Sequence, residues 1–286
     1  MWIIYAALSA LFAGFTSILA KAGIKETNST LATALRTIVV LILSWLMVLI
    51  VESQSTLSEL SVRTWAFLIL SGISTGASWL CYFRALQIGE VNKVAVIDKS
   101  SIVLTLVFAF IFLGEQLTIM KSTAIILIAC GTLMMVKKQS VENSVKNKSW
   151  VLYAGVSALF ASLTTVLGKI GIDGVESNLG TAIRTTVVLI MAWLMVFFTK
   201  KSVKMKRINK RELFFIFLSG LATGASWLCY YRALQDGQTS TVVAIDKLSI
   251  VVTVFFAYLI FREKLTIKAM LGLILIVIGT LCMVVG

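Results

Sequence analysis

Two pairs of oppositely charged residues, each inside an apolar segment, are the side chains of this sequence best suited to chemistry. Asp98 and Lys99 lie in the stretch IDKS, and Asp246 and Lys247 lie in the matching stretch IDKL. Each Asp or Lys at the centre of a membrane helix costs about 2.5 to 3.5 kcal/mol on insertion scales. Such side chains should therefore face a polar interior, where a carboxylate can carry a proton or help to bind a solute. A purely structural ion pair is the alternative.

The overall composition predicts an integral membrane protein. Of the 286 residues, 59% are hydrophobic and 14% are charged, a balance that soluble globular chains do not show. Histidine is absent and the four cysteines lie in apolar runs, so we expect no metal site, no cofactor and no disulfide framework. The net charge of +13 arises mostly in short connections between apolar runs. This pattern marks a cytoplasmic membrane face and argues against nucleic acid as a partner.

The apolar runs predict an all-α protein with ten transmembrane helices. Each run has roughly 18 to 25 residues, which suits about 30 Å of hydrocarbon. The expected spans are residues 2–20, 31–51, 64–88, 91–113, 119–136, 150–168, 179–199, 212–236, 239–261 and 267–285.

The second half of the chain repeats the first. Trp2 matches Trp150, an offset of 150 − 2 = 148, and the octapeptide TGASWLCY that begins at Thr75 recurs unchanged from Thr223. The expected organisation is a first five-helix repeat, a linker and a second five-helix repeat at residues 1–138, 139–149 and 150–286. Because each repeat has an odd number of spans, the second copy inserts upside down, as in the inverted repeats of secondary transporters.

Polar side chains at helical spacing predict the lining of a solute path. Two helices each carry an acid, a serine and a threonine at positions i, i+3 and i+7, which lie on one helical face. These residues are Asp98, Ser101 and Thr105, with the counterparts Asp246, Ser249 and Thr253. Four aromatic residues well inside their spans join the candidate path, namely Trp79, Tyr82, Trp227 and Tyr230. For the two tryptophans, cavity lining and core packing remain open alternatives.

Six further charged residues are candidates for gates at the two mouths of that path. They are Arg36, Arg84, Glu115, Arg184, Arg232 and Glu263. Counting 1.5 Å per residue, we expect Glu263 to lie near Arg36 and Arg84, and Glu115 to lie near Arg184 and Arg232. The alternatives are that the arginines Arg36 and Arg184 snorkel to the headgroups and that the glutamates only end their helices.

Three stretches carry a resemblance to a known family. The chain resembles the EamA family of the drug/metabolite transporter superfamily in GASWLCYFRALQ, IDKSSIVLT and the following GEQLT. That family includes five-span proteins and ten-span fusions. Proline often precedes the IDK element in that family, whereas this chain contains no proline. The resemblance implies a multi-pass protein of the cell membrane, and specifically of the bacterial inner membrane.

The function expected from these features is secondary transport and not catalysis. The cargo would be a small organic metabolite, with an amino acid or another carboxylate-bearing solute favoured because cations outnumber acids in the path, and with export as the favoured direction. Alternating access would move it. A non-transporting membrane scaffold, or a protein that modifies or flips lipids, is the alternative. The expected partners are the solute and the bilayer, and the expected assembly is a monomer or homodimer.

The basic connections also predict an orientation. They cluster at the face where the odd-numbered spans of the first repeat end, which places that face in the cytoplasm and both termini outside. Ten-span relatives are usually drawn with both termini inside.

Overall fold

The computed structural model of this chain consists of helices. It describes residues 1–23, 27, 29–88, 94, 97, 100–135, 149–198, 209–262 and 266–286. The elements in these ranges are α1 (Trp2–Gly23), α2 (Ser29–Ile50), the 3₁₀ helix η1 (Ser53–Glu59), α3 (Val62–Ile88), α5 (Ser101–Leu113), α6 (Ile119–Met135), α7 (Ser149–Gly171), α8 (Ser177–Phe198), α9 (Lys210–Asp236), α10 (Thr239–Asp246), α11 (Ser249–Phe261) and α12 (Ile267–Val285).

These helices confirm the predicted class of an all-α membrane protein. Within the described ranges, eight helical spans are long and apolar enough to cross a bilayer, and α5 and α6 are shorter apolar helices. One of the eight runs from Thr239 to Ile260 and combines α10 with α11. A continuous apolar surface of this kind suits hydrocarbon, because lipid tails cannot satisfy polar side chains.

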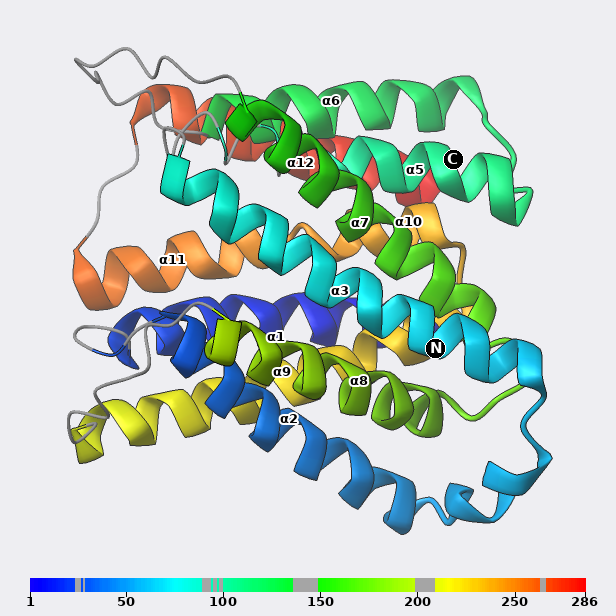
Figure 1. Cartoon of the computed structure of the whole chain (residues 1–286). Coiled ribbons are helices and arrows are strands. Elements are labelled where there is room, and N and C mark those ends of the chain that lie inside the picture. The colour runs from blue at the N-terminus through cyan, green and yellow to red at the C-terminus, as the bar shows by residue number, and fades with distance from the viewer. Residues whose placement is uncertain are drawn as a thin grey trace.

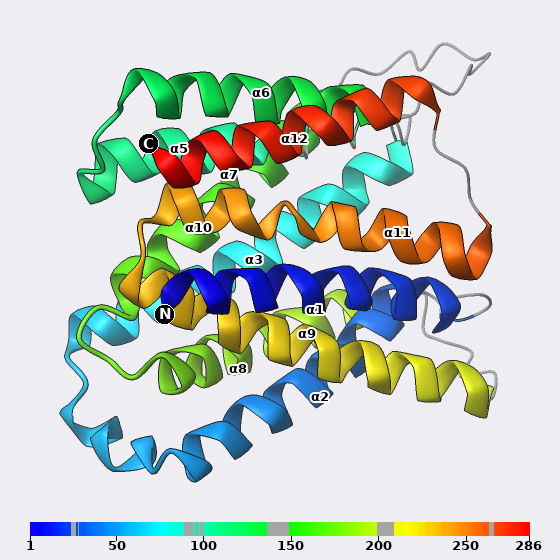
Figure 2. The same cartoon turned by 180° about the vertical axis from the view of Figure 1, so that it is seen from behind.

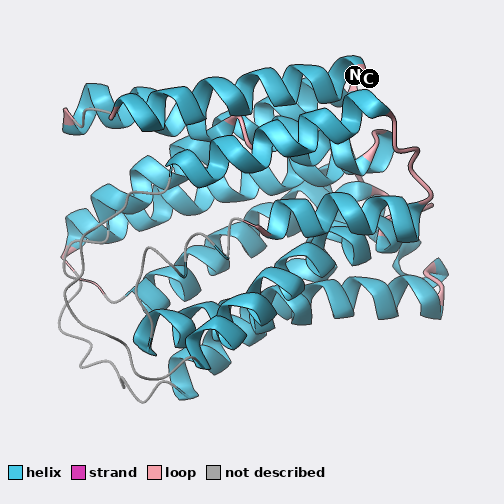
Figure 3. Cartoon of the chain, turned by 90° about the horizontal axis from the view of Figure 1, so that it is seen from above, coloured by secondary structure: helices cyan, strands magenta, loops and turns pink. Residues whose placement is uncertain are grey.

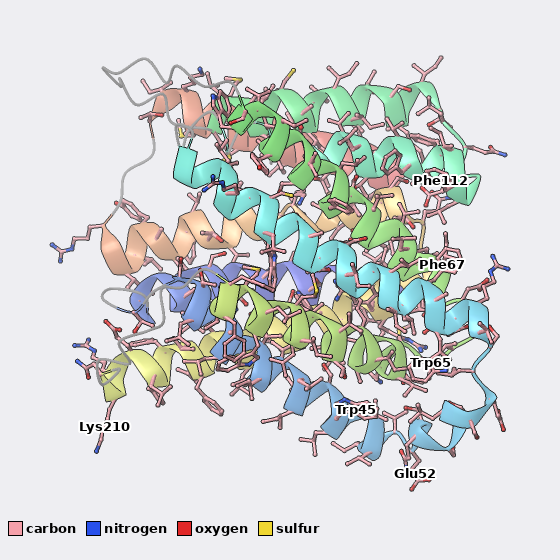
Figure 4. All side chains as sticks on the ribbon, viewed as in Figure 1. Trp45, Glu52, Trp65, Phe67, Phe112 and Lys210 are labelled. Atoms are coloured by element: carbon pink, nitrogen blue, oxygen red, sulfur yellow. The ribbon has the colours of Figure 1, made fainter. Side chains whose placement is uncertain are left out.

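The helices lie side by side and run between the same two ends of the molecule (Figures 1 and 2). Both chain termini lie at one end, here called the terminal face (Figure 3). Glu52 and Phe112 lie at that end, while Lys210 lies at the opposite end, here called the basic face (Figure 4).

Helices from the two halves of the chain pair with one another. The most extensive interfaces join α3 to α7, α1 to α9, α6 to α12 and α2 to α8. Because α7 and α3 are the counterparts of α1 and α9 at the 148-residue offset, the first two interfaces are copies of each other. This interleaving of repeats encloses the interior between them.

Glycines allow two further helix pairs to approach closely. A Cβ atom placed on Gly72 of α3 would lie 2.7 Å from the Val187 Cβ of α8, and one on Gly220 of α9 would lie 2.6 Å from the Val39 Cβ of α2. Only a residue without a side chain fits at such a distance. The two matching seams, α3–α8 and α9–α2, are therefore equally tight.

The ninth span is broken at its centre although it contains no proline. α10 ends at Asp246 and α11 begins at Ser249. Across the break the backbone makes tighter bonds three residues apart: the Leu248 N–H donates to the Ile245 carbonyl at 2.9 Å, and the Ile250 N–H donates to the Lys247 carbonyl at 3.1 Å. Discontinuous helices of this kind form the solute sites of many carriers.

Candidate functional site

Two adjoining cavities lie between the repeats. The first has a volume of about 430 Å³ and the second about 560 Å³. Their linings have six residues in common, namely Ser78, Trp79, Ser101, Ile102, Ala161 and Lys247. The cavities therefore lie next to each other in the interior.

Most of the path residues expected from the sequence line these cavities. The first cavity is bordered by Trp79, Ser101, Thr105, Trp227, Tyr230, Asp246 and Lys247. The second is bordered by Trp79, Tyr82, Ser101, Lys247, Ser249 and Thr253. Asp98 and Lys99, and the gate candidate Glu263, lie outside the described residues.

The break between α10 and α11 places Asp246 and Lys247 at the cavity. Asp246 is the last residue of α10, and its Oδ1 accepts a hydrogen bond from the Ser9 hydroxyl of α1 at 3.2 Å. Ser9 also lies 3.3 Å, oxygen to oxygen, from Ser226 of α9. Thr280 of α12 donates to the Ala244 carbonyl at 3.2 Å. Hydroxyl groups from three other helices thus support the polar groups at the break, where a half-buried carboxylate has lost part of its hydration.

Arg184 of α8 also lines the first cavity, as do Asp246 and Lys247. Only 3% of its surface is exposed. Its Nε donates to the Ser71 hydroxyl at 3.0 Å, and its Nη2 donates to the Thr75 hydroxyl at 2.8 Å. Snorkelling to the headgroups is therefore wrong for Arg184, because two hydroxyls of α3 hold its guanidinium inside the protein.

Aromatic rings border the same guanidinium. The Arg184 Cζ lies 4.9 Å from the centre of the Trp227 ring and 4.7 Å from that of Tyr231. Such cation–π contacts stabilise a desolvated cation by about 2 kcal/mol. Trp227 is therefore a cavity residue and not only part of the core.

The third nitrogen of the Arg184 guanidinium, Nη1, is buried and has no hydrogen-bond partner among the residues that the structure describes. An unsatisfied buried donor costs about 1 to 3 kcal/mol, and more when it is charged. A guanidinium in the lining of a polar cavity is chemically suited to bind a carboxylate or another oxyanion.

The sequence led us to expect Glu115 near Arg184 and Arg232, but its carboxylate pairs with neither arginine. Its carboxylate accepts hydrogen bonds from the backbone N–H groups of Thr239 and Ser240, at the start of α10. The expectation failed because depth alone cannot say which way a side chain points, and the free N–H groups of a helix start attract a carboxylate.

The other arginines named as gates lie away from the first cavity. Arg232 pairs with Asp236 on its own helix at 3.5 Å, and both side chains are partly exposed. Arg84 is exposed on α3, and Arg36 is half-buried on α2. Asp236, one helical turn from Arg232, thus accounts for the position of the Arg232 side chain without any contact between the repeats.

The turn between α9 and α10 is held by further charged residues that the sequence did not single out as gates. Lys169 of α7 donates to the backbone carbonyls of Leu234, Gln235 and Gly237, where α9 ends. Lys121 of α6, which is 4% exposed, donates to the Gln238 side chain at 2.7 Å. Together with Glu115, these contacts clamp the α9–α10 turn at the terminal face; we call them the turn clamp.

Tyr231 is a further cavity residue that sequence reasoning missed. It borders the first cavity and the Arg184 guanidinium, whereas the matching position of the first repeat holds Phe83. The sequence did contain a signal for Tyr231: its hydroxyl is present in only one of the two repeats, and a buried hydroxyl needs a polar partner.

Comparison with known proteins supports a transport role. A family model described as the EamA-like transporter family matches residues 1–137 and 148–285. A protein from Sinorhizobium sp., described as an uncharacterized transporter in the cobO 3' region, is 45% identical over 134 residues, which are 47% of this chain and 95% of that protein. A solved structure, described only as the crystal structure of a protein, superposes with a TM-score of 0.76 at 14% identity over 97% of this chain and 94% of its own. That last likeness shows the fold alone.

Proposed function

This chain belongs to the EamA-like transporter family, and on that premise we propose that it moves a small carboxylate-bearing metabolite across the membrane by alternating access. The family match confirms the resemblance inferred from the sequence and the general role of a multi-pass membrane transporter with two repeats. Our proposal goes beyond this general role in three respects: the class of the solute, the alternating-access mechanism, and the direction of transport, which we propose to be export.

The observation that carries this proposal is the buried Arg184 in the lining of the first cavity, whose guanidinium Nη1 has no hydrogen-bond partner among the described residues. A solute carboxylate would accept a charge-assisted hydrogen bond from this nitrogen and neutralise a desolvated cation. Lys247 adds a second positive charge to the lining, and Asp246 adds a negative one. This set suits a solute with a carboxylate and, in the case of an amino acid, a nearby ammonium group.

The proposed transport cycle exchanges the arrangements of the two repeats. Arg184 is held by Ser71 and Thr75 of the α3–α8 seam, and the matching residues of the α9–α2 seam are Arg36, Ser219 and Thr223. In the second state, Arg36 would bond to Ser219 and Thr223 while Arg184 is released. Because the repeats are inverted, this exchange would transfer access from one face to the other.

A binding experiment tests the solute class. Purified protein should be stabilised against thermal unfolding by carboxylic solutes, including amino acids, and not by the corresponding carboxamides of the same size. The amide removes only the charge that Arg184 is proposed to bind. Equal stabilisation by acids and amides would contradict the proposal.

The two aspartates are the proposed proton carriers if transport is coupled to protons. Protonation removes a charge that the membrane interior penalises. Uptake into vesicles by the double variant Asp98→Asn with Asp246→Asn should then lose its dependence on pH. A double variant with the pH dependence of the wild type would remove both residues from the coupling role.

A further inference from the structure

A groove on the outside of the bundle is separate from the central path. It lies between α2 and α9, has a volume of about 480 Å³ and shares no lining residue with either central cavity. Its lining residues are Leu35, Ile38, Val39, Lys210, Leu213, Phe214, Ile216 and Phe217. Among the described residues of the lining, only Lys210 is charged, so the groove has the character of a site for a hydrocarbon chain.

The groove begins at the basic face and follows the first two turns of α9. Lys210 is the first residue of α9, and Phe217 lies about 10 Å further along the helix at 1.5 Å per residue. Phe214 is 57% exposed and Phe217 is 48% exposed. Large apolar side chains with such exposure belong to a surface that the bilayer covers.

The matching seam of the other repeat has a bulky side chain where this groove is hollow. Leu213 corresponds to Trp65, since 213 − 148 = 65. Trp65 packs against a buried cluster that includes Leu68 and Leu179. The replacement of an indole by the smaller leucine therefore accompanies the hollow at the α9–α2 seam.

The charged residues at the head of the groove are mostly positive. Lys210 lines the groove, and Arg211 follows it and is exposed. The acid next to them, Glu212, is 7% exposed and accepts hydrogen bonds from the backbone N–H and the hydroxyl of Thr27. Glu212 is therefore engaged within the protein, which leaves the basic pair to face the headgroup region.

We propose that the α2–α9 groove binds one anionic phospholipid, with an acyl chain along Leu213 and Phe217 and the phosphate at Lys210 and Arg211. A basic residue near an anionic membrane surface contributes about 1 kcal/mol. The site would attach the α9–α2 seam to the lipid. If that seam rearranges as in the proposed transport cycle, the bound lipid would make transport sensitive to bilayer composition.

Lipid binding by the purified full chain tests this site. Native mass spectrometry should show one phosphatidylglycerol bound more tightly than phosphatidylcholine with the same acyl chains. Lys210→Gln and Arg211→Gln should each weaken phosphatidylglycerol binding about fivefold, the ratio that 1 kcal/mol represents. Leu213→Trp, which fills the groove as Trp65 fills its counterpart, should weaken the binding of both lipids.

Arg63→Gln is the matched control, because Arg63 occupies the position of Arg211 in the other repeat. It should leave lipid binding unchanged. Equal affinity for the two lipids, or equal losses in Arg63→Gln and Arg211→Gln, would overturn the proposal. A change from dimer to monomer in Leu213→Trp would also overturn it, because a second copy of the chain would then be the occupant. If Leu213→Trp does not fold, the two charge variants still decide.

Discussion

Arg184 and Arg36 occupy matching positions in the two repeats, yet their side chains lie in different environments. The seams around them agree: a Cβ on Gly72 would lie 3.0 Å from the Arg184 carbonyl, and one on Gly220 would lie 3.1 Å from the Arg36 carbonyl. Arg184 is buried and bonded to α3, whereas Arg36 is half-buried and makes no hydrogen bond in the described part of the chain.

This difference teaches that the two seams share one backbone spacing and differ in the state of the arginine side chain. Ser219 and Thr223, the counterparts of the hydroxyls that hold Arg184, bond to Thr16 of α1, at 3.3 Å in each case. Ser71 and Thr75 make the matching contacts to Thr164 of α7 and accept hydrogen bonds from Arg184 as well. The hydroxyls for a second arginine site are therefore present, and among the described residues they accept no hydrogen bond from Arg36. An asymmetric pair of this kind is what an alternating-access carrier needs in either of its end states.

The largest expected effect is the loss of solute binding in Arg184→Gln. The variant removes a charge-assisted hydrogen bond of about 1.5 to 3 kcal/mol, so affinity for a carboxylic solute should fall about ten- to one-hundredfold. Arg36→Gln is the control and should change affinity severalfold at most. Titration of thermal stability with solute measures both, and equal losses in the two variants would erase the proposed difference between the repeats.

Alanine substitutions at the two glycine seams should lower stability equally, in contrast to the unequal effects expected for the two arginines. Gly72→Ala and Gly220→Ala each place a Cβ against a valine of the facing helix and should each lower stability by about 1 to 3 kcal/mol. Gly155→Ala serves as the control, since nothing lies within 4 Å of its Cβ position. Thermal unfolding in detergent measures the effect. A loss at only one seam would show that the two backbones do not match.

A smaller difference is expected for the threonines that serve the two arginines. Thr75→Val removes the hydroxyl that accepts from the Arg184 Nη2, and solute affinity should fall about five- to tenfold. Thr223→Val should leave that affinity unchanged and slow transport in vesicles, because its hydroxyl is proposed to act only in the second state. Unaltered transport by Thr223→Val would count against the exchange of arrangements.

The smallest effect is expected at the turn clamp. Glu115→Gln removes a charge near the start of α10, where a negative charge contributes about 0.3 to 1 kcal/mol. We expect the clamp to keep the mouth of the solute path at the terminal face closed. In Glu115→Gln, a cysteine introduced at Thr105 in a Cys-free background should therefore be alkylated from the terminal face about two- to fivefold faster.

Glu176→Gln is the control for the clamp. The Glu176 carboxylate also accepts a backbone hydrogen bond at a helix start, from Leu179 at 3.0 Å, but it lies within one repeat. In Glu176→Gln, the cysteine at Thr105 should be alkylated at the same rate as in the protein that keeps both glutamates. The same rate in Glu115→Gln would mean that the clamp does not hold the terminal mouth shut.

Much of the fold could be predicted from the sequence, because it depends on local properties. Long apolar runs can only be membrane helices, since hydrocarbon leaves no other way to satisfy the backbone. The 148-residue offset and the odd number of spans then set the inverted relation of the repeats. Path residues such as Asp246 and Thr253 could be named because a polar group is costly anywhere else in a membrane span.

The partners of the charged side chains were decided only by the tertiary structure. Glu115 was expected near Arg184 and instead binds the start of α10, and the break that places Asp246 at the cavity formed without proline. Arg36 and Arg184 have the same residue type, the same neighbours of matching type and the same depth within their repeats. Their different states arise from the packing between the repeats, and no local pattern in a duplicated sequence distinguishes the copy that is satisfied.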